Sequence, residues 1–191
     1  EITPKLGYDY LLNFGFTSLS NKDIVESMAL GGISKGVSNL ELNAAYATIA
    51  NGGTYTKPRF YTKILDREGN VIIDNTPQTH TVLKATTAWL LTSAMKDVIT
   101  QGTGKNAGFP GMTLAAKTGT TNDSRDSLFA GFSPYYSCVI WGGYDDNAPM
   151  ASTSYTKLLW KTIMTQIHVG LENKDFVQPT GITTANICTK S

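Results

Sequence analysis

The stretch of sequence best suited to chemistry is LAAKTGTTNDS, residues 114 to 124. Lys117 follows a short apolar run and precedes Thr118, Gly119 and Thr120. A cation, two hydroxyls and the free N–H groups of a strand edge can hold a carboxylate and stabilise an oxyanion. A glycine in a strand also lets a ligand backbone approach closely. On the tripeptide Lys-Thr-Gly alone, the simpler interpretation is a lysine that snorkels from a strand end beside threonines that favour β structure.

The surrounding pattern predicts elements that could position this strand. Ser38 and Glu41 form a capping box, which opens a helix over residues 39–50 that Gly52 and Gly53 close. Further elements follow from period and turn chemistry: short helical segments at 8–13 and 21–29, a hairpin of 60–66 with 71–74, a helix over 86–100, strands at 112–119, 127–133 and 136–144, and a helix over about 154–169. The short polar turns between the three strands favour an antiparallel meander. We therefore expect an α+β fold, an antiparallel β-sheet flanked by helices on both faces.

Length and composition narrow the functional classes. The chain has 191 residues, enough for one domain with a real core, and 16 Lys plus Arg nearly balance 15 Asp plus Glu. This balance gives no electrostatic reason to expect nucleic acid as a partner. No apolar run reaches the roughly 18 residues of a membrane span. The chain begins at Glu1 and not at Met, so we expect a piece of something longer, whose membrane anchor lies in the remainder.

The cysteines and histidines do not suggest a metal site. Cys138 lies in an apolar run and Cys188 in a polar tail, and a disulfide between them is not expected because the tail would have to reach a central strand. His80 and His168 are far apart in sequence, and no cluster of His, Cys and carboxylate has metal-ligand spacing. We expect neither a metal nor another cofactor.

Two further motif matches lack their structural context. The sequence GTGKNA, residues 102–107, fits loose dinucleotide and phosphate-loop patterns, but a predicted helix precedes it where both patterns need a strand. Asn106 also stands where a phosphate loop needs Ser or Thr. We interpret 102–107 as a glycine-rich loop that ends a helix. The triplet Asn122-Asp123-Ser124 matches a glycosylation acceptor, and we interpret it as a turn.

Several long stretches, in a fixed order, resemble one protein family. These are ALGGISKGVSNLELNAAYATIANGGTYTKP, LTSAMKDVITQGTGKNAG and AAKTGTTNDSRDSLFAGFSPYYSCVIWGGYDDN. Together they resemble the C-terminal part of the transpeptidase domain of class A penicillin-binding proteins, within the serine β-lactamase superfamily. Residues 1–170 would be this part of the domain and 171–191 a loose C-terminal tail. One departure is Leu128, where many relatives have tryptophan, so the packing beneath that strand is expected to differ.

The resemblance implies roles for the residues of the KTG motif. Lys117 is similar to the family's lysine that supports proton transfer and substrate recognition. Thr118 and Thr120 resemble the hydroxyl pair that holds the terminal carboxylate of a D-Ala-D-Ala stem peptide or of a β-lactam. The backbone N–H of Thr120 would be one oxyanion-hole donor, and Gly119 would leave room for a ligand that adds along the strand edge.

The nucleophile is the part that the sequence does not supply. This chemistry needs a serine with a lysine one helical turn later. The pairs Ser93–Lys96 and Ser154–Lys157 match the spacing, but the resemblance places the first on a helix away from the catalytic one and the second after the KTG motif instead of before it. The family's Ser-x-Asn motif is absent. We expect both missing motifs on an upstream part, and this chain alone to be inactive.

Three functions stay open at this point. The resemblance favours a peptidoglycan D,D-transpeptidase, a serine acyltransferase and β-lactam target with a membrane anchor and a glycosyltransferase domain further upstream, acting on the extracytoplasmic face of the bacterial membrane. A D,D-carboxypeptidase or β-lactamase shares the motif and differs in sending the acyl-enzyme to water. A non-catalytic binding module would also fit a chain without a nucleophile.

Overall fold

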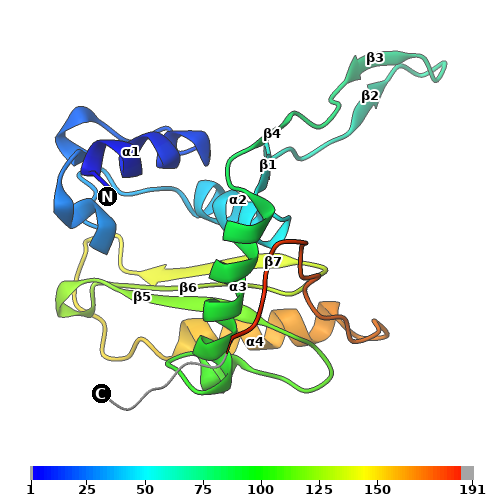
Figure 1. Cartoon of the computed structure of the whole chain (residues 1–191). Coiled ribbons are helices and arrows are strands. Elements are labelled where there is room, and N and C mark those ends of the chain that lie inside the picture. The colour runs from blue at the N-terminus through cyan, green and yellow to red at the C-terminus, as the bar shows by residue number, and fades with distance from the viewer. Residues whose placement is uncertain (1, 186–191) are drawn as a thin grey trace.

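The computed structural model describes residues 2–185 as a small sheet between helices, with an arm that projects from it (Figure 1). The helices are α1 (Pro4–Asn13), α2 (Asn39–Ala50), α3 (Ala85–Thr100) and α4 (Tyr155–Ile167), with the 3-10 helices η1 (Asn21–Asp23), η2 (Glu26–Leu30), η3 (Lys105–Ala107) and η4 (Asn122–Ser124). The strands are β1 (Thr54–Thr56), β2 (Lys63–Leu65), β3 (Val71–Asp74), β4 (Thr79–Thr81), β5 (Ala115–Thr120), β6 (Asp126–Phe132) and β7 (Ser137–Gly143).

The central sheet is the antiparallel meander that the sequence predicts. Its strand order is β5-β6-β7, with each strand paired to the next along the chain. Gly119 on β5 lies opposite Leu128 on β6, which in turn lies opposite Trp141 on β7. Because opposite residues in a sheet project to the same face, this register decides which side chains border the KTG motif.

Helices cover both faces of this sheet, which confirms the predicted fold class. On one face, α4 contributes Trp160, whose ring meets Phe129 edge-on at 5.1 Å between centroids. On the other face, Met95 of α3 packs with Ala115 and Phe132, and side chains of α2 join this cluster. Phe129, Phe132 and Trp160 are completely buried. The two apolar clusters hold β5 and β6 from opposite sides.

The buried faces of α3 and α4 match the sequence pattern only in part. Helical spacing of apolar residues predicts core contacts at Trp89, Leu90, Met95 and Val98 on α3 and at Leu158, Leu159, Ile163 and Ile167 on α4. Met95 is buried as expected, but an expected group is exposed: Leu90, Leu158, Leu159 and Ile167. Instead α4 directs Thr156, Trp160 and Met164 at the sheet. Gly131 explains the choice, because a Cβ there would lie 2.7 Å from the Trp160 ring. Trp160 therefore occupies a gap in the sheet surface that the helix sequence by itself cannot reveal.

Side-chain hydrogen bonds organise the segment before α2. The capping box of Ser38 and Glu41 forms as predicted. Asp23 is buried, and its carboxylate accepts hydrogen bonds from the backbone and hydroxyl of Ser34 and of Ser20. The bonds from Ser34, then those from Ser20, hold the pKa of the Asp23 carboxyl well below its usual range. The Asp23 carboxylate thus connects Ser20 to Ser34 through hydrogen bonds. The sequence predicts one helical segment at 21–29, and the structure has the two 3-10 helices η1 and η2 there instead.

An arm built from two strand pairs projects from the body beside α2 (Figure 1). At its base β1 pairs with β4, and His80 Nε2 donates a hydrogen bond to the Asn13 carbonyl oxygen at 2.8 Å. At its tip β2 pairs with β3 as predicted, and every residue of these two strands is exposed. The short β1–β4 pair is an element that the sequence pattern did not predict.

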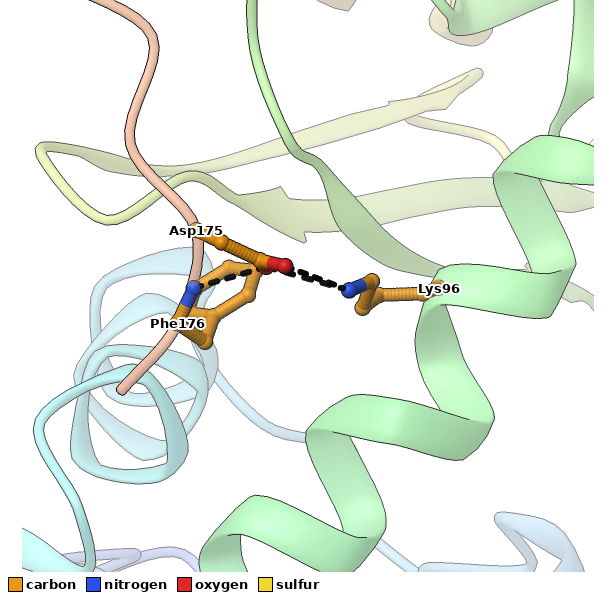
Figure 2. Close-up of polar contacts among 3 residues, drawn as sticks. All are labelled: Lys96, Asp175 and Phe176. Carbon is orange, nitrogen blue, oxygen red and sulfur yellow. Dashed lines mark hydrogen bonds and ion pairs between the residues drawn. The ribbon is translucent and has the colours of Figure 1, made fainter. Parts of the chain in front are cut away.

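The segment after α4 is docked against α3 at one point, although the sequence predicts a loose tail. Figure 2 shows Lys96 reaching Asp175, with Nζ 3.0 Å from Oδ1, while the Phe176 N–H donates to the same carboxylate. Partial burial raises the pKa of Asp175, but these hydrogen bonds outweigh it and leave the pKa below its ordinary value. The Phe176 ring meets Phe132 edge-on at 5.5 Å.

The remaining predictions on composition can be placed in the same structure. Cys138 lies half-buried on β7, where burial raises the pKa of its thiol, and Cys188 lies outside the described residues. No helix within residues 2–185 has the length and apolar character to cross a membrane. Among the same residues, no three His, Cys, Asp or Glu side chains form a group that could hold a metal ion.

Candidate active site

The KTG motif lies on β5, at an edge of the central sheet. Ala115 and Ala116 are buried in opposite clusters, and exposure begins at Lys117. Since side chains alternate along a strand, Lys117 shares the face of Ala115, toward α2 and α3, while Thr118 shares the face of Ala116, toward α4. The buried alanines thus anchor β5 in the two apolar clusters, and the polar residues follow where the helices no longer cover the strand.

Lys117 reaches the edge of the strand with its side chain. Its Nζ donates to the backbone carbonyl of Thr118 at 2.8 Å. In an antiparallel pair, residues two apart direct their backbone groups the same way, so the N–H and C=O of Thr118 and Thr120 share a direction. The ammonium and the N–H groups of Thr118 and Thr120 together offer donors for an anion.

Thr118 is engaged by a second threonine. Its hydroxyl lies 2.9 Å from the hydroxyl of Thr103, in the loop between α3 and η3. This loop is the GTGKNA stretch, and it follows a helix as predicted. Thr103 was not identified by sequence reasoning, since it is 15 positions away from Thr118 along the chain and nothing in its own type marks the contact.

The described residues leave room for a side chain at Gly119. A Cβ built on Gly119 would make ordinary contact with Leu128, at 3.4 Å from its Cβ. By contrast, a Cβ on Gly131 of β6 would collide with Trp160. Packing within residues 2–185 therefore does not account for a glycine at this position. Leu128 is the side chain directly opposite.

The end of β5 is closed by a small polar network that the sequence did not single out. Thr121 Oγ1 donates to Asp126 Oδ2 at 2.9 Å, and the Asp126 N–H donates back to Thr121 Oγ1 at 2.8 Å. Trp141 Nε1 donates to the other Asp126 oxygen at 2.9 Å. Asp123 and Ser124 form a tight turn with positive φ angles, which confirms the turn interpretation of that triplet. Thr120 thus directly precedes a turn that is stabilised by the hydrogen bonds of Thr121, Asp126 and Trp141.

Neither Ser-x-x-Lys pair is arranged as a nucleophile with its base. On α3 the Lys96 ammonium is held by Asp175. On α4 the Lys157 ammonium donates to the backbone carbonyl of Thr103 at 3.4 Å, and Ser154 is the N-cap residue. Across residues 2–185, no hydrogen bond joins Ser93 to Lys96 or Ser154 to Lys157.

The second histidine also has a structural partner. His168 Nδ1 lies 2.6 Å from the Met164 carbonyl, so Nδ1 carries the proton, and Nε2 accepts from the Ser133 hydroxyl at 2.7 Å. The same Ser133 oxygen accepts the N–H groups of Tyr135 and Tyr136. Both Ser133 and His168 are buried, and they fasten the turn between β6 and β7 to the end of α4.

Comparison with known proteins identifies the family of this chain. The family model of the penicillin-binding protein transpeptidase domain matches residues 5–163. Penicillin-binding protein 1A of Clostridium tetani is 35% identical over all of this chain and 26% of that protein. Penicillin-binding protein 1F of Bacillus subtilis is 35% identical over 87% of this chain and 24% of that protein. The chain belongs to the penicillin-binding protein transpeptidase domain family, which confirms the resemblance to class A members.

Solved structures show the same fold. PonA1 of Mycobacterium tuberculosis, solved in complex with penicillin V, superposes with a TM-score of 0.82 at 25% identity, over 94% of this chain and 54% of that one. Penicillin-binding protein 1A of Haemophilus influenzae superposes with a TM-score of 0.80 at 22% identity, over 97% of this chain and 34% of that one. The chain spans about a quarter of the length of the curated relatives it matches.

Proposed function

We propose that this chain supplies the substrate-binding wall of a peptidoglycan D,D-transpeptidase, with the serine nucleophile on an upstream segment. The observation that carries the proposal is the edge position of β5. At this edge lie the side chains of Lys117, Thr118 and Thr120. Gly119 lies among them, and packing within residues 2–185 would leave room for a side chain there. An extended peptide can add to such an edge as an extra strand.

The chemistry assigns each group a task. A serine attacks the carbonyl of the penultimate D-alanine, the terminal D-alanine leaves, and an amine of a neighbouring stem peptide then attacks the acyl-enzyme. Thr118 and Thr120 hold the terminal carboxylate through their hydroxyls. The Thr120 N–H stabilises the oxyanion that develops during attack. Lys117 adds positive charge where the carboxylate and the transferring proton meet.

The same site would accept a β-lactam, because that ring carries a carboxylate and an acylating carbonyl in the same relation. A substrate of this kind lies outside the membrane, so we place the domain on the extracytoplasmic face, anchored through an upstream segment. The hydrolase alternative shares every group named here. It differs in the lifetime of the acyl-enzyme, which a hydrolase shortens by admitting water.

Labelled benzylpenicillin tests the proposal when the protein is prepared in two forms, this chain alone and the complete domain. We expect the complete domain to carry a long-lived penicilloyl group on an upstream serine, seen by intact mass and peptide mapping. This chain alone should stay unmodified. Label on Ser93 or Ser154, or no label on the complete domain, would contradict the proposal, and rapid loss of label from the complete domain would favour the hydrolase.

A further inference from the structure

The GTGKNA loop is folded back tightly on the end of α3. The Gly102 N–H donates to the Asp97 carbonyl at 2.8 Å, and the Gly104 N–H donates to the Val98 carbonyl at 2.9 Å. A Cβ on Gly102 would lie 2.8 Å from Val98 Cα, and one on Gly104 would lie 3.1 Å from the Val98 carbonyl oxygen. A side chain at 102 would collide with the helix backbone and one at 104 would crowd it, so the two glycines let the loop approach α3 closely on either side of Thr103.

That residue is Thr103, and it is held on both its side chain and its backbone. Its hydroxyl pairs with the hydroxyl of Thr118 at 2.9 Å. Its carbonyl accepts from the ammonium of Lys157 on α4 at 3.4 Å. The loop therefore contacts the edge strand through the Thr103 hydroxyl and α4 through the Thr103 carbonyl.

The direction of the hydrogen bond between these two hydroxyls decides whether the Thr118 proton is free for a ligand. Each hydroxyl has one proton to donate, and either oxygen can accept. If Thr118 donates to Thr103, its proton is unavailable to a ligand. If Thr103 donates to Thr118, the Thr118 proton is free for an anion, and the bond it receives strengthens the bond it gives. A bound carboxylate, which only accepts, selects the second arrangement.

We propose that Thr103 is a positioning residue for the carboxylate site, donating to Thr118 Oγ1 so that the Thr118 proton points at the ligand. This inference rests on the proposed function and adds to it a residue outside the KTG motif. It also gives the glycines on either side a purpose, since they set the distance between the two hydroxyls.

The test uses the complete domain and benzylpenicillin, with acylation kinetics resolved into affinity and limiting rate. Thr103→Val removes the donor at nearly constant shape, and we expect affinity to fall about three- to tenfold, the worth of one hydrogen bond, with the limiting rate nearly unchanged. Thr103→Ser should restore affinity. Thr100→Val, at the exposed end of α3, is the matched control and should leave both quantities unchanged.

A double-mutant cycle separates positioning from a merely structural role. In a Thr118→Val background, Thr103→Val should cause no further loss, because the Thr118 hydroxyl to which Thr103 donates is gone. Additive losses, equal affinity in Thr103→Val and wild type, or failure of Thr103→Ser to restore affinity would each overturn the inference while leaving the proposed function standing. A wild-type domain that penicillin does not acylate would overturn the proposed function itself. Melting temperatures establish that each variant is folded, and Thr103→Ala replaces Thr103→Val if the latter is not.

Discussion

The central sheet and the projecting arm are both antiparallel, but they are held together in different ways. In the sheet, Phe129 of β6 is completely buried, and its ring packs against Trp160 of α4. In the arm, Ile72 of β3 is 63% exposed, and the hairpin is shaped by its turn, where Asp66 accepts from Asn70 and Gly69 has a φ of +86°. The sheet depends on contacts between distant segments, whereas the arm tip depends on neighbours in sequence.

This difference bears on function because the proposed site is on the sheet. Two apolar clusters and the hydrogen bonds of Asp126 fix the position of β5. Its polar residues are therefore held in place by the packing of the sheet. The arm tip has no comparable cover within residues 2–185. Substitutions under the sheet should therefore disturb both stability and ligand binding, and substitutions on the arm should disturb neither.

The largest expected effect is that of Phe129→Ala. It removes a fully buried ring and leaves a cavity beside Trp160, which should lower the free energy of unfolding by about 3 to 5 kcal/mol. Denaturant unfolding of the complete domain measures this value. A loss below about 1 kcal/mol would show that the sheet is not held by this cluster and would break the comparison.

A smaller effect is expected at the turn between β6 and β7. Ser133→Ala removes the hydroxyl that His168 accepts from and leaves the part-buried N–H groups of Tyr135 and Tyr136 without this acceptor. The free energy of unfolding should fall by about 1 to 3 kcal/mol. Ser133→Thr, which keeps the hydroxyl, is the matched variant in the same unfolding measurement, and equal losses in the two would show that volume and not hydrogen bonding is at issue.

The smallest effect is expected on the arm. Ile72→Ser replaces an exposed apolar side chain, and stability should change by about 0.5 kcal/mol or less, with penicillin acylation unchanged. Thermal unfolding and labelling of the complete domain check both. A loss comparable to that of Phe129→Ala would mean that the arm tip packs against another part of the protein.

The two regions also differ in how far the sequence predicts them. The arm tip and the α2 capping box follow from local chemistry, Asp66 to Asn70 and Ser38 to Glu41, and both were predicted correctly. The sheet order also followed from short turns. The buried face of α4 did not, because Trp160 fits a gap left by Gly131, and no periodicity in α4 records the shape of β6.

The candidate site divides in the same way. The types and spacing of Lys117, Thr118 and Thr120 marked β5 directly. Thr103 and Asp126 were missed, since each acts on the site through a contact made only in the folded chain. The glycines around Thr103 were noticed as a motif, but their purpose depends on the end of α3, against which they pack.

The most direct measurement of the central claim is penicillin acylation of Gly119→Ala in the complete domain. The added methyl would make only ordinary contact with Leu128, so the melting temperature should stay near that of wild type. A ligand aligned along β5 would meet this methyl, so the acylation rate should fall by about tenfold or more, the cost of a modest steric misfit at the reacting centre. Wild-type acylation by Gly119→Ala would contradict the claim that the edge of β5 binds the ligand.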